Sequence, residues 1–201
     1  LLKNISFGIE KNQHIGLIGD NGCGKTTLIK LMLGILKPQK GTIFLEGKNV
    51  KEVPLSHIGR KIGYMFQNPE KQLFCPTVRE QMCFSFKYGN EINQHDMEER
   101  INHYLEMFEL EKYKNDSPMN LSRGEKQRLV LASVLSRDVE FLIMDEPTTG
   151  LDMRRKKQLE KCLETLKNEE KGYMIVSHDS DFLEKNVDKL LILSSKGVEV
   201  K

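Results

Sequence analysis

Short apolar runs alternate along the chain with segments whose apolar residues recur at helical spacing. A short run bounded by polar residues or glycine is typical of a buried strand, whereas a spacing of three to four residues is typical of a helix. The first pattern predicts strands over residues 5–10, 13–18, 41–47, 61–66, 141–144, 173–176 and 189–193. The second predicts helices over residues 27–33, 78–88 and 97–110, a helix that begins at Ser122, and one whose core face holds Leu159, Cys162, Leu163 and Leu166.

The order of these elements predicts an α/β fold. Strands that alternate with helices form a largely parallel sheet flanked by helices, and such a sheet binds ligands at the carboxyl ends of its strands. Strand patterns stop between residues 70 and 120, which indicates a helical insert. We therefore expect a single domain, residues 1–201, with an antiparallel β region near the N-terminus. Its core is expected over residues 1–67 and 123–201 and its helical subdomain over about 68–122.

Composition narrows the function. The 201 residues carry a net charge of only +2, without the basic surface typical of nucleic-acid-binding proteins, so we expect no nucleic-acid partner. The basic run at residues 154–157 is interpreted as a solvated helix face rather than a nucleic-acid patch. No apolar run approaches the ~20 residues that cross a bilayer, so membrane contact is expected to be peripheral. The four cysteines lack metal-ligand spacing and are expected to be free thiols in a reducing cytosol.

Residues 19–26 match the phosphate-loop pattern G-x-x-x-x-G-K-T. The loop follows a predicted strand and opens a predicted helix, which is the context that the motif requires. Its glycines let backbone N–H groups converge on an anion, and the helix N-terminus adds positive potential. The pattern predicts a nucleoside triphosphate, with Lys25 at the β- and γ-phosphates and the Thr26 hydroxyl on Mg²⁺. A chance glycine-rich turn is the alternative, and this context disfavours it.

Two carboxylates, Asp145 and Glu146, follow the apolar run at residues 141–144. A carboxylate at a strand tip can hold the Mg²⁺ of a phosphate loop, and a second one can polarise the attacking water. We expect Asp145 to be the metal-side acid and Glu146 the general base for attack on the γ-phosphate. In a chain without a phosphate loop, a surface pair after an edge strand would be the better interpretation.

Ser122 lies where an N-cap belongs, before a segment of strong helix propensity. A plain capped helix is one interpretation. The other is a second phosphate-binding surface, because a serine hydroxyl, the Gly124 N–H and a helix N-terminus all favour anions. This surface is far along the chain from the phosphate loop, so it can serve a different nucleotide.

Together these motifs resemble the ATP-binding cassette (ABC) ATPases over the whole chain. The motifs that carry the resemblance are Walker A at residues 19–26, Gln67 after its strand, the signature around Ser122, Walker B at Asp145 and Glu146, the D-loop at residues 149–152 and the switch histidine His178. The family implies a P-loop NTPase fold of the ABC type. It also implies a head-to-tail dimer, in which two ATP molecules lie between Walker A of one subunit and the signature of the other.

The resemblance further implies roles for single residues. Ser122 and Gly124 would contact the γ-phosphate of the partner's nucleotide, and Asp152 would signal across the dimer. Gln67 would sense Mg²⁺ and the membrane partner, and His178 would brace the γ-phosphate and the attacking water. The expected catalytic residues are Glu146, His178, Gln67 and Lys25; the expected ATP contacts in Walker A are Gly19, Asn21, Gly22, Cys23, Gly24, Lys25, Thr26 and Thr27; and the expected metal ligands are Thr26, Gln67 and Asp145.

Residues 64–74 resemble the energy-coupling-factor branch of the family, which imports vitamins, cobalt and nickel. The signature departs from the family pattern, because Arg123 stands where glycine is usual and Glu125 where glutamine is usual. If Arg123 points into the nucleotide cleft, it would pair with phosphate or obstruct phosphate binding. If Arg123 points outward, it would change the nucleotide site little. The chain opens without methionine, so we expect a trimmed N-terminus and allow for a trimmed C-terminus. The family's adenine-stacking aromatic is then expected to lie outside this chain.

We expect an ATP-hydrolysing motor subunit of an ABC importer at the cytoplasmic face of the membrane. ATP and Mg²⁺, a second ABC subunit and integral membrane subunits are the implied ligands and partners. One alternative is a soluble ABC ATPase that acts on ribosomes or DNA, although such chains usually carry paired cassettes, coiled coils or basic arms. The other is a degenerate cassette that binds ATP without hydrolysis, against which Lys25, Asp145, Glu146 and His178 argue.

Overall fold

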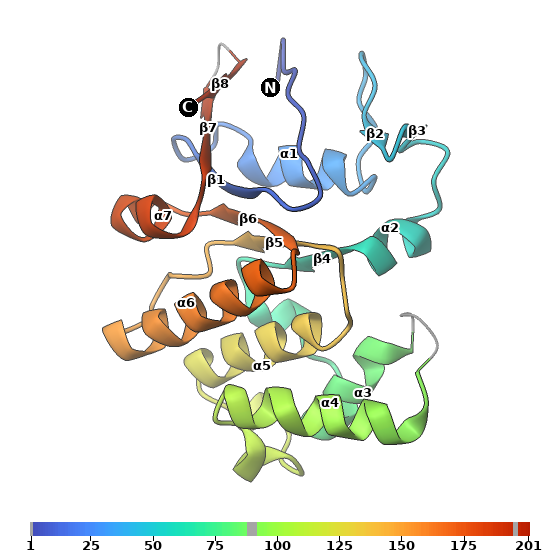
Figure 1. The fold of residues 1–201 in the computed structure, drawn as a ribbon, viewed down its shortest axis with the longest axis vertical. Helices are drawn as coiled ribbons and strands as arrows, with labels where there is room; N and C mark the ends of the chain where they lie inside the picture. Colours follow the sequence, from blue (N-terminus) through green and yellow to red (C-terminus); the bar gives the residue numbers. More distant parts are fainter. Residues whose placement is uncertain (1, 88–91, 195–196) are drawn as a thin grey trace.

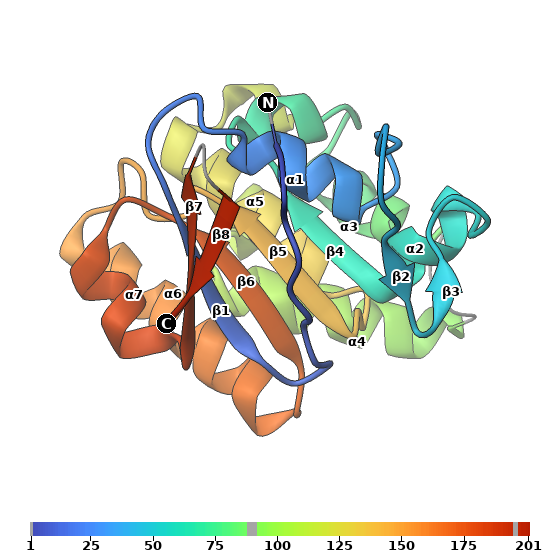
Figure 2. The ribbon, with the colours of Figure 1, turned by 90° about the horizontal axis from the view of Figure 1, so that it is seen from above.

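A mostly parallel sheet, with one antiparallel strand at its edge, forms the centre of the molecule. The computed structural model describes residues 2–87, 92–194 and 197–201, so Leu1 and Tyr88, which belong to predicted segments, lie outside the described residues. The strands are ordered β4-β5-β6-β1-β7-β8 across the sheet (Figure 2). Their bounds are β1 His14–Ile18, β4 Ile62–Met65, β5 Phe141–Asp145, β6 Gly172–Val176, β7 Lys189–Ser194 and β8 Gly197–Val200. Only the β7–β8 pair is antiparallel among these described strands.

Helices cover both faces of the sheet (Figure 1). One face carries α1 and α2, together with a separate hairpin of β2 and β3. The other face carries α5 and α6, with α3 and α4 packed beyond them. The bounds are α1 Lys25–Met32, α2 Leu55–Lys61, α3 Val78–Phe86, α4 Gln94–Met107, α5 Arg123–Leu135, α6 Met153–Asn168 and α7 Ser180–Asn186, with β2 at Phe44–Leu45 and β3 at Lys48–Asn49. Short 3₁₀ turns occupy Pro69–Gln72, Glu111–Tyr113 and Pro118–Asn120.

Successive residues of the central strands point to opposite faces. Leu142 and Met144 of β5 join the core beneath α5 and α6, whereas Phe141 and Ile143 join the core beneath α1. Every residue of β5 and β6 is buried, because both faces are covered. This explains why both strands appear in the sequence as continuous apolar runs rather than as alternating patterns.

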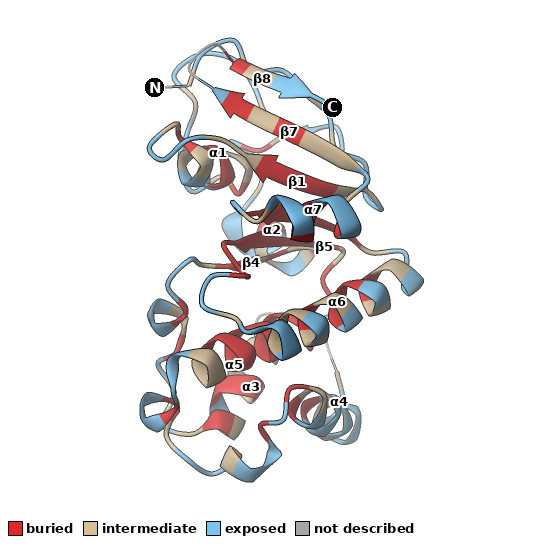
Figure 3. Ribbon diagram, turned by 90° about the vertical axis from the view of Figure 1, so that its left-hand side faces the viewer, coloured by how far each residue is buried: buried red, intermediate tan, exposed pale blue. Residues whose placement is uncertain are grey.

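Helix α5 is the most deeply enclosed helix of the helical side. It is buried from Gln127 to its end at Leu135, whereas α6 exposes one face (Figure 3). The predicted core residues of α6 are all buried, namely Leu159, Cys162, Leu163 and Leu166. Among the described residues, no helix combines the length and apolar character that crossing a bilayer requires.

The α/β architecture and the antiparallel β region near the N-terminus are confirmed, but two predicted strands need correction. Residues 5–10, all of them described, are extended and belong to no strand. Their alternation arises because Ile5, Phe7 and Ile9 pack on the core around α1, and no neighbouring strand pairs with them. The strand predicted over residues 41–47 shrinks to β2, since Glu46 and Gly47 both have positive φ and form the turn of the β2–β3 hairpin. Helices α2 and α7 and strand β8 were not predicted.

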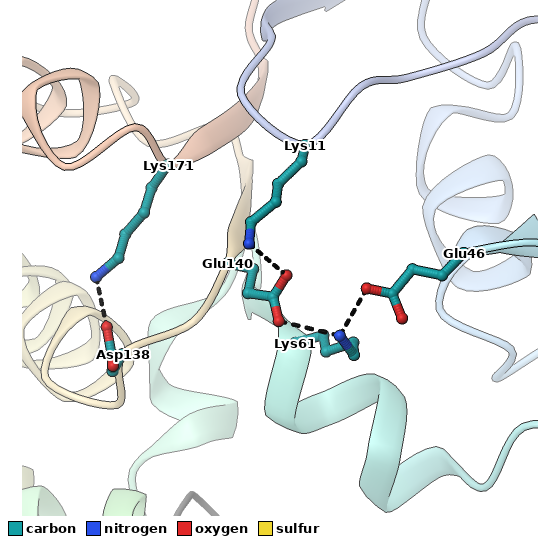
Figure 4. A network of polar contacts seen from close by, with 6 residues as sticks. All are labelled: Lys11, Glu46, Lys61, Asp138, Glu140 and Lys171. Atoms are coloured by element: carbon teal, nitrogen blue, oxygen red, sulfur yellow. Dashed lines mark hydrogen bonds and ion pairs between the residues drawn. The ribbon is translucent and has the colours of Figure 1, made fainter.

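Charged side chains join four segments at the amino-terminal edge of the sheet (Figure 4). Glu140, immediately before β5, accepts from Lys61 at 3.0 Å and pairs with Lys11 at 3.0 Å. Lys61 also donates to Glu46 of the hairpin at 2.6 Å. Hydrogen bonds from Lys61 and then Lys11 lower the pKa of Glu140 below its ordinary value. The network therefore ties the N-terminal segment and the hairpin to the start of the central strands.

We predict that Glu140→Gln lowers the free energy of unfolding by less than about 1 kcal/mol at pH 7, which is typical of a partly exposed ion pair. Because folding lowers the pKa of Glu140, the carboxylate stabilises the fold above its unfolded value and loses this effect as the pH falls through the folded value. The difference from wild type should therefore shrink below pH 4.5 in urea titrations. Glu164→Gln, on the exposed face of α6, is the control; an equal Glu140→Gln effect at every pH would contradict the prediction.

Candidate functional site

The loop at residues 19–24 curls between β1 and α1 because two of its glycines adopt left-handed conformations and a third lies against β7. Gly22 and Gly24 have φ of 79° and 110°, in the left-handed region that disfavours a side chain. A Cβ on Gly19 would lie 2.4 Å from the Leu193 carbonyl oxygen. The loop is thus pressed against β7, and α1 begins directly at Lys25.

The Lys25 side chain folds back over this loop. Its Nζ donates to the Gly19 carbonyl at 2.6 Å and to the Asp20 carbonyl at 3.2 Å. The ammonium group is therefore held by backbone carbonyls of the loop, and within the described part of the chain it forms no ion pair with a carboxylate. The next residue, Thr26, donates its hydroxyl to Asp145 Oδ2 at 3.2 Å, which joins the loop to the tip of β5.

Parallel pairing of β5 with β6 places three predicted residues at the same edge of the sheet. Asp145 lies opposite Val176 in register, and the Glu146 N–H donates to the Val176 carbonyl at 2.8 Å. His178 follows two residues later, and its Nε2 lies 3.3 Å from Glu146 Oε1. Glu146 has φ of 55°, and a left-handed conformation in a non-glycine residue is a strain that concentrates at functional sites.

The Asp145 carboxylate is buried with neutral partners. It is 3% exposed and accepts from Thr26 and from the Tyr64 hydroxyl, the latter at 3.3 Å. Burial raises its pKa above the ordinary value, and the two hydrogen bonds only partly offset that effect. Within the described residues no cation forms an ion pair with it. Such a carboxylate is suited to a bound cation, which would supply the missing positive charge.

A cleft of about 560 Å³ collects these groups. Its walls come from the phosphate loop, the start of α1 and the carboxyl ends of β4, β5 and β6. The lining residues are Asn21, Gly22, Gly24, Lys25, Thr26, Thr27, Gln67, Asp145, Glu146, Thr149 and His178.

The structure brings together the predicted Walker A, Walker B, Gln67 and His178 residues, with two exceptions. Gly19 and Cys23 are not part of the cleft wall. Cys23 packs behind the loop, where its Sγ lies 2.8 Å from the position that a Cβ on Gly19 would take.

The predicted signature and D-loop residues do not reach this cleft in the same subunit. Ser122, Gly124 and Asp152 lie outside its lining residues. Ser122 caps α5, and the Arg155 guanidinium lies 2.8 Å from where a Cβ on Gly124 would be. Asp152 caps α6 by accepting from the Arg155 N–H at 2.9 Å. These residues gather at the start of the two helices instead.

Arg123, the departure in the signature, is the first residue of α5 and is exposed. It is not part of the cleft wall of its own subunit.

Sequence reasoning missed three residues that support the cleft. Tyr64 donates to Asp145, and Thr149 donates to Glu146 Oε2 at 3.3 Å. Gln72 holds the chain before Gln67, because its amide bonds both the Phe66 N–H at 2.7 Å and the Tyr64 carbonyl at 2.9 Å. Tyr64 lies between the buried residues Gly63 and Met65 on β4, so the alternation of the strand could have shown that its side chain points to the opposite face from theirs. The Gln72 contact depends on a 3₁₀ turn that sequence spacing does not indicate.

The sequence is similar to those of known proteins. The ABC transporter family profile matches residues 2–149. A putative ABC transporter ATP-binding protein of Pyrococcus furiosus is 38% identical over 199 residues, which cover 99% of this chain and 76% of that protein. The energy-coupling factor transporter ATP-binding protein EcfA1 of Thermotoga maritima is 37% identical, over 99% of this chain and 74% of that protein.

Solved structures agree. The structure of cbiO1 from Clostridium perfringens, described as part of the ABC transporter complex cbiONQ, has a TM-score of 0.81 at 28% identity and covers 98% of this chain and 80% of its own. The dimeric structure of a bacterial ABC transporter cassette has a TM-score of 0.85 at 25% identity, with coverage of 98% and 88%. The chain belongs to the ABC transporter family and is an ATP-binding cassette ATPase of that family.

Proposed function

We propose that this ATPase is the motor subunit of an energy-coupling-factor type importer of a vitamin or a metal ion. It works as a head-to-tail dimer, bound peripherally to integral membrane subunits at the cytoplasmic face of the membrane. The proposal rests on the cleft beside the phosphate loop. One wall of residues lines it, which includes Lys25, Thr26, Asp145, Glu146 and His178.

In this proposal the phosphate loop holds ATP. The loop N–H groups and the start of α1 favour the phosphate oxygens, and Lys25 leaves its loop carbonyls to neutralise the β- and γ-phosphates. Gln67 and His178 approach the γ-phosphate from the ends of β4 and β6. Thr27 and Asn21 complete the wall around the phosphates.

The residues of the cleft also fit Mg²⁺. Thr26, Asp145 and Gln67 would hold the ion, which would neutralise charge on the phosphates. One buried carboxylate with a hydroxyl beside it is a suitable set, because Mg²⁺ is usually bound by one or two carboxylates together with substrate phosphates and water. The lack of any cation paired with Asp145 in the described part of the chain supports the same assignment.

Hydrolysis then needs a base, and Glu146 is placed for it. Its carboxylate accepts a proton from water while the water oxygen attacks the γ-phosphorus and the bond to the β-phosphate oxygen breaks, which yields ADP and phosphate. Thr149 and His178 contact its two oxygens and orient them. Only 9% of Glu146 is exposed, so few bulk water molecules compete at this base.

The dimer supplies the other half of the phosphate site. Ser122 and Gly124 lie away from the cleft of their own subunit, so in a head-to-tail arrangement they meet the nucleotide of the partner, and Asp152 lies at the contact. The dimeric cassette among the similar structures supports this arrangement. A single subunit is then a poor ATPase.

The transporter assignment rests on the relatives and on the helical insert. One relative is named an energy-coupling factor transporter ATP-binding protein, and one similar structure is described as part of a transporter complex. We assign residues 68–122, with Gln67 at their start, as the subdomain that docks on membrane subunits. Exposed Phe74 lies within this segment, 59% accessible.

We predict that Glu146→Gln lowers kcat for ATP at least about 100-fold, because the general base is lost, while ATP binding persists. Steady-state phosphate release and equilibrium nucleotide titration measure the two effects. Specific activity of the wild type should also rise with protein concentration as dimers form.

The matched control is Glu164→Gln, an exposed residue of α6, which should leave kcat unchanged. If the wild type hydrolyses no ATP, alone or with its membrane subunits, the motor assignment fails and the degenerate cassette replaces it. Co-purification with ribosomes or DNA, and with no membrane protein, would favour the soluble ATPase instead.

We also predict that alkylation at Cys23 blocks ATP binding, because an adduct behind the loop would displace its backbone N–H groups. Cys23→Ser should bind ATP normally and resist N-ethylmaleimide in a nucleotide titration. Burial raises the pKa of Cys162 to about 12, so that thiol reacts slowly. Equal sensitivity of Cys23→Ser to the reagent would disprove the prediction.

A further inference from the structure

The Glu125 side chain at the start of α5 is held by three hydrogen-bond donors. The Ser122 N–H and the Ser122 hydroxyl both donate to Oε2, at 2.8 and 2.6 Å. The Tyr113 hydroxyl donates to Oε1 at 2.7 Å. These bonds, that of the Ser122 hydroxyl most of all, lower the pKa of Glu125 to about 2. Glu125 is therefore a carboxylate at neutral pH.

This arrangement fixes the direction of the Ser122 hydroxyl. A carboxylate only accepts hydrogen bonds, so Ser122 must donate its single hydroxyl hydrogen to Glu125. The Ser122 oxygen meanwhile accepts from the Glu125 N–H at 3.4 Å. The hydroxyl has no second hydrogen to offer to a phosphate oxygen, and the neighbouring carboxylate repels a phosphate.

We propose that Glu125 is a positioning residue that sets the ATP concentration at which the dimer closes, by keeping the Ser122 hydroxyl hydrogen on its own carboxylate until the partner's γ-phosphate competes for it. The inference rests on the proposed function, in which Ser122 meets the partner's nucleotide. The exchange is a rotation about the Ser122 Cβ–Oγ bond. No covalent bond changes and no proton is transferred.

The chain contains a matched control for the capping box of Ser122 and Glu125. Thr77 and Glu80 form the same capping box on α3, with Thr77 N–H and hydroxyl donating to Glu80 Oε2 at 3.1 and 3.2 Å. Neither residue belongs to the cleft wall or to the signature. Glu80→Gln thus makes the same change of charge and of cap as Glu125→Gln, on a helix none of whose residues lines the cleft. The titration below contains no membrane subunit, so the docking role assigned to residues 68–122 does not affect it.

The experiment is an ATP titration of the full chain carrying Glu146→Gln, with the dimer fraction measured by sedimentation velocity. The half-point is the ATP concentration at which half of the protein is dimeric. Adding Glu125→Gln should lower this half-point about fivefold, since a neutral amide competes less strongly than a carboxylate for the hydroxyl. Glu80→Gln should leave the half-point unchanged. In the ATPase assay without Glu146→Gln, the Glu125→Gln variant should lower KM for ATP with little change in kcat, a split that a loss of stability would not produce.

A third arm isolates the hydroxyl. In a Ser122→Ala background the effect of Glu125→Gln should largely disappear; an effect of unchanged size would show simple charge repulsion and overturn the proposal. A half-point that Glu125→Gln leaves unchanged, or shifts no more than Glu80→Gln does, also overturns it. If ATP dimerises none of the variants, both the proposed dimer and this inference are wrong. If dimers form with unaltered half-points, only the inference is wrong.

Discussion

The site depends on the pairing of β5 with β6 at the carboxyl edge of the sheet. The hydrogen bond from the Glu146 N–H to the Val176 carbonyl continues the ladder by one residue beyond Asp145. It fixes Glu146 in its left-handed conformation, with its side chain toward His178. A shift of β5 by one residue in this register would turn its side chains to the opposite face and move the carboxylates away from the phosphate loop. Packing on both faces of the sheet excludes that shift.

Burial determines how strongly the charges at the end of β5 interact with their surroundings. Asp145 and Glu146 end a strand whose residues are all enclosed, so their charges are poorly hydrated and are balanced mainly by hydroxyl groups and by His178. A buried carboxylate without a cation is unfavourable, which is why the pKa of Asp145 rises. The same burial strengthens its attraction for an incoming cation, because the local dielectric is low. The fold thus holds a destabilising charge at the place where the ligand would relieve it.

The grouping of these side chains in one cleft could be predicted because the sequence signals for it are local. Glycine spacing, an apolar strand and two acids at its tip need no knowledge of distant contacts, and the cleft unites Lys25, Asp145 and His178 as expected. Prediction failed where an element depends on its neighbours. Residues 5–10 alternate as a strand does, but their apolar side chains pack on the α1 core without a pairing strand. The seven-residue helix α2 contains Gly59 and is too short for a clear period.

Helix α5 connects the residues around Ser122 with the segments that carry the cleft. Ser122 lies at its start, away from the cleft. Further along, the buried Gln127 donates to the Pro147 carbonyl, directly after Glu146, and Lys126 pairs with Glu70 at 3.2 Å, beyond Gln67. Residues 127–135 are all buried, and a closely packed interior transmits strain rather than absorbing it. In the proposed dimer, a force applied at Ser122 by the second subunit would therefore reach the segments that carry Glu146 and Gln67. In the proposed dimer, the capping box would control when the Ser122 hydroxyl binds the partner's nucleotide, and α5 would carry the effect of that contact to the cleft.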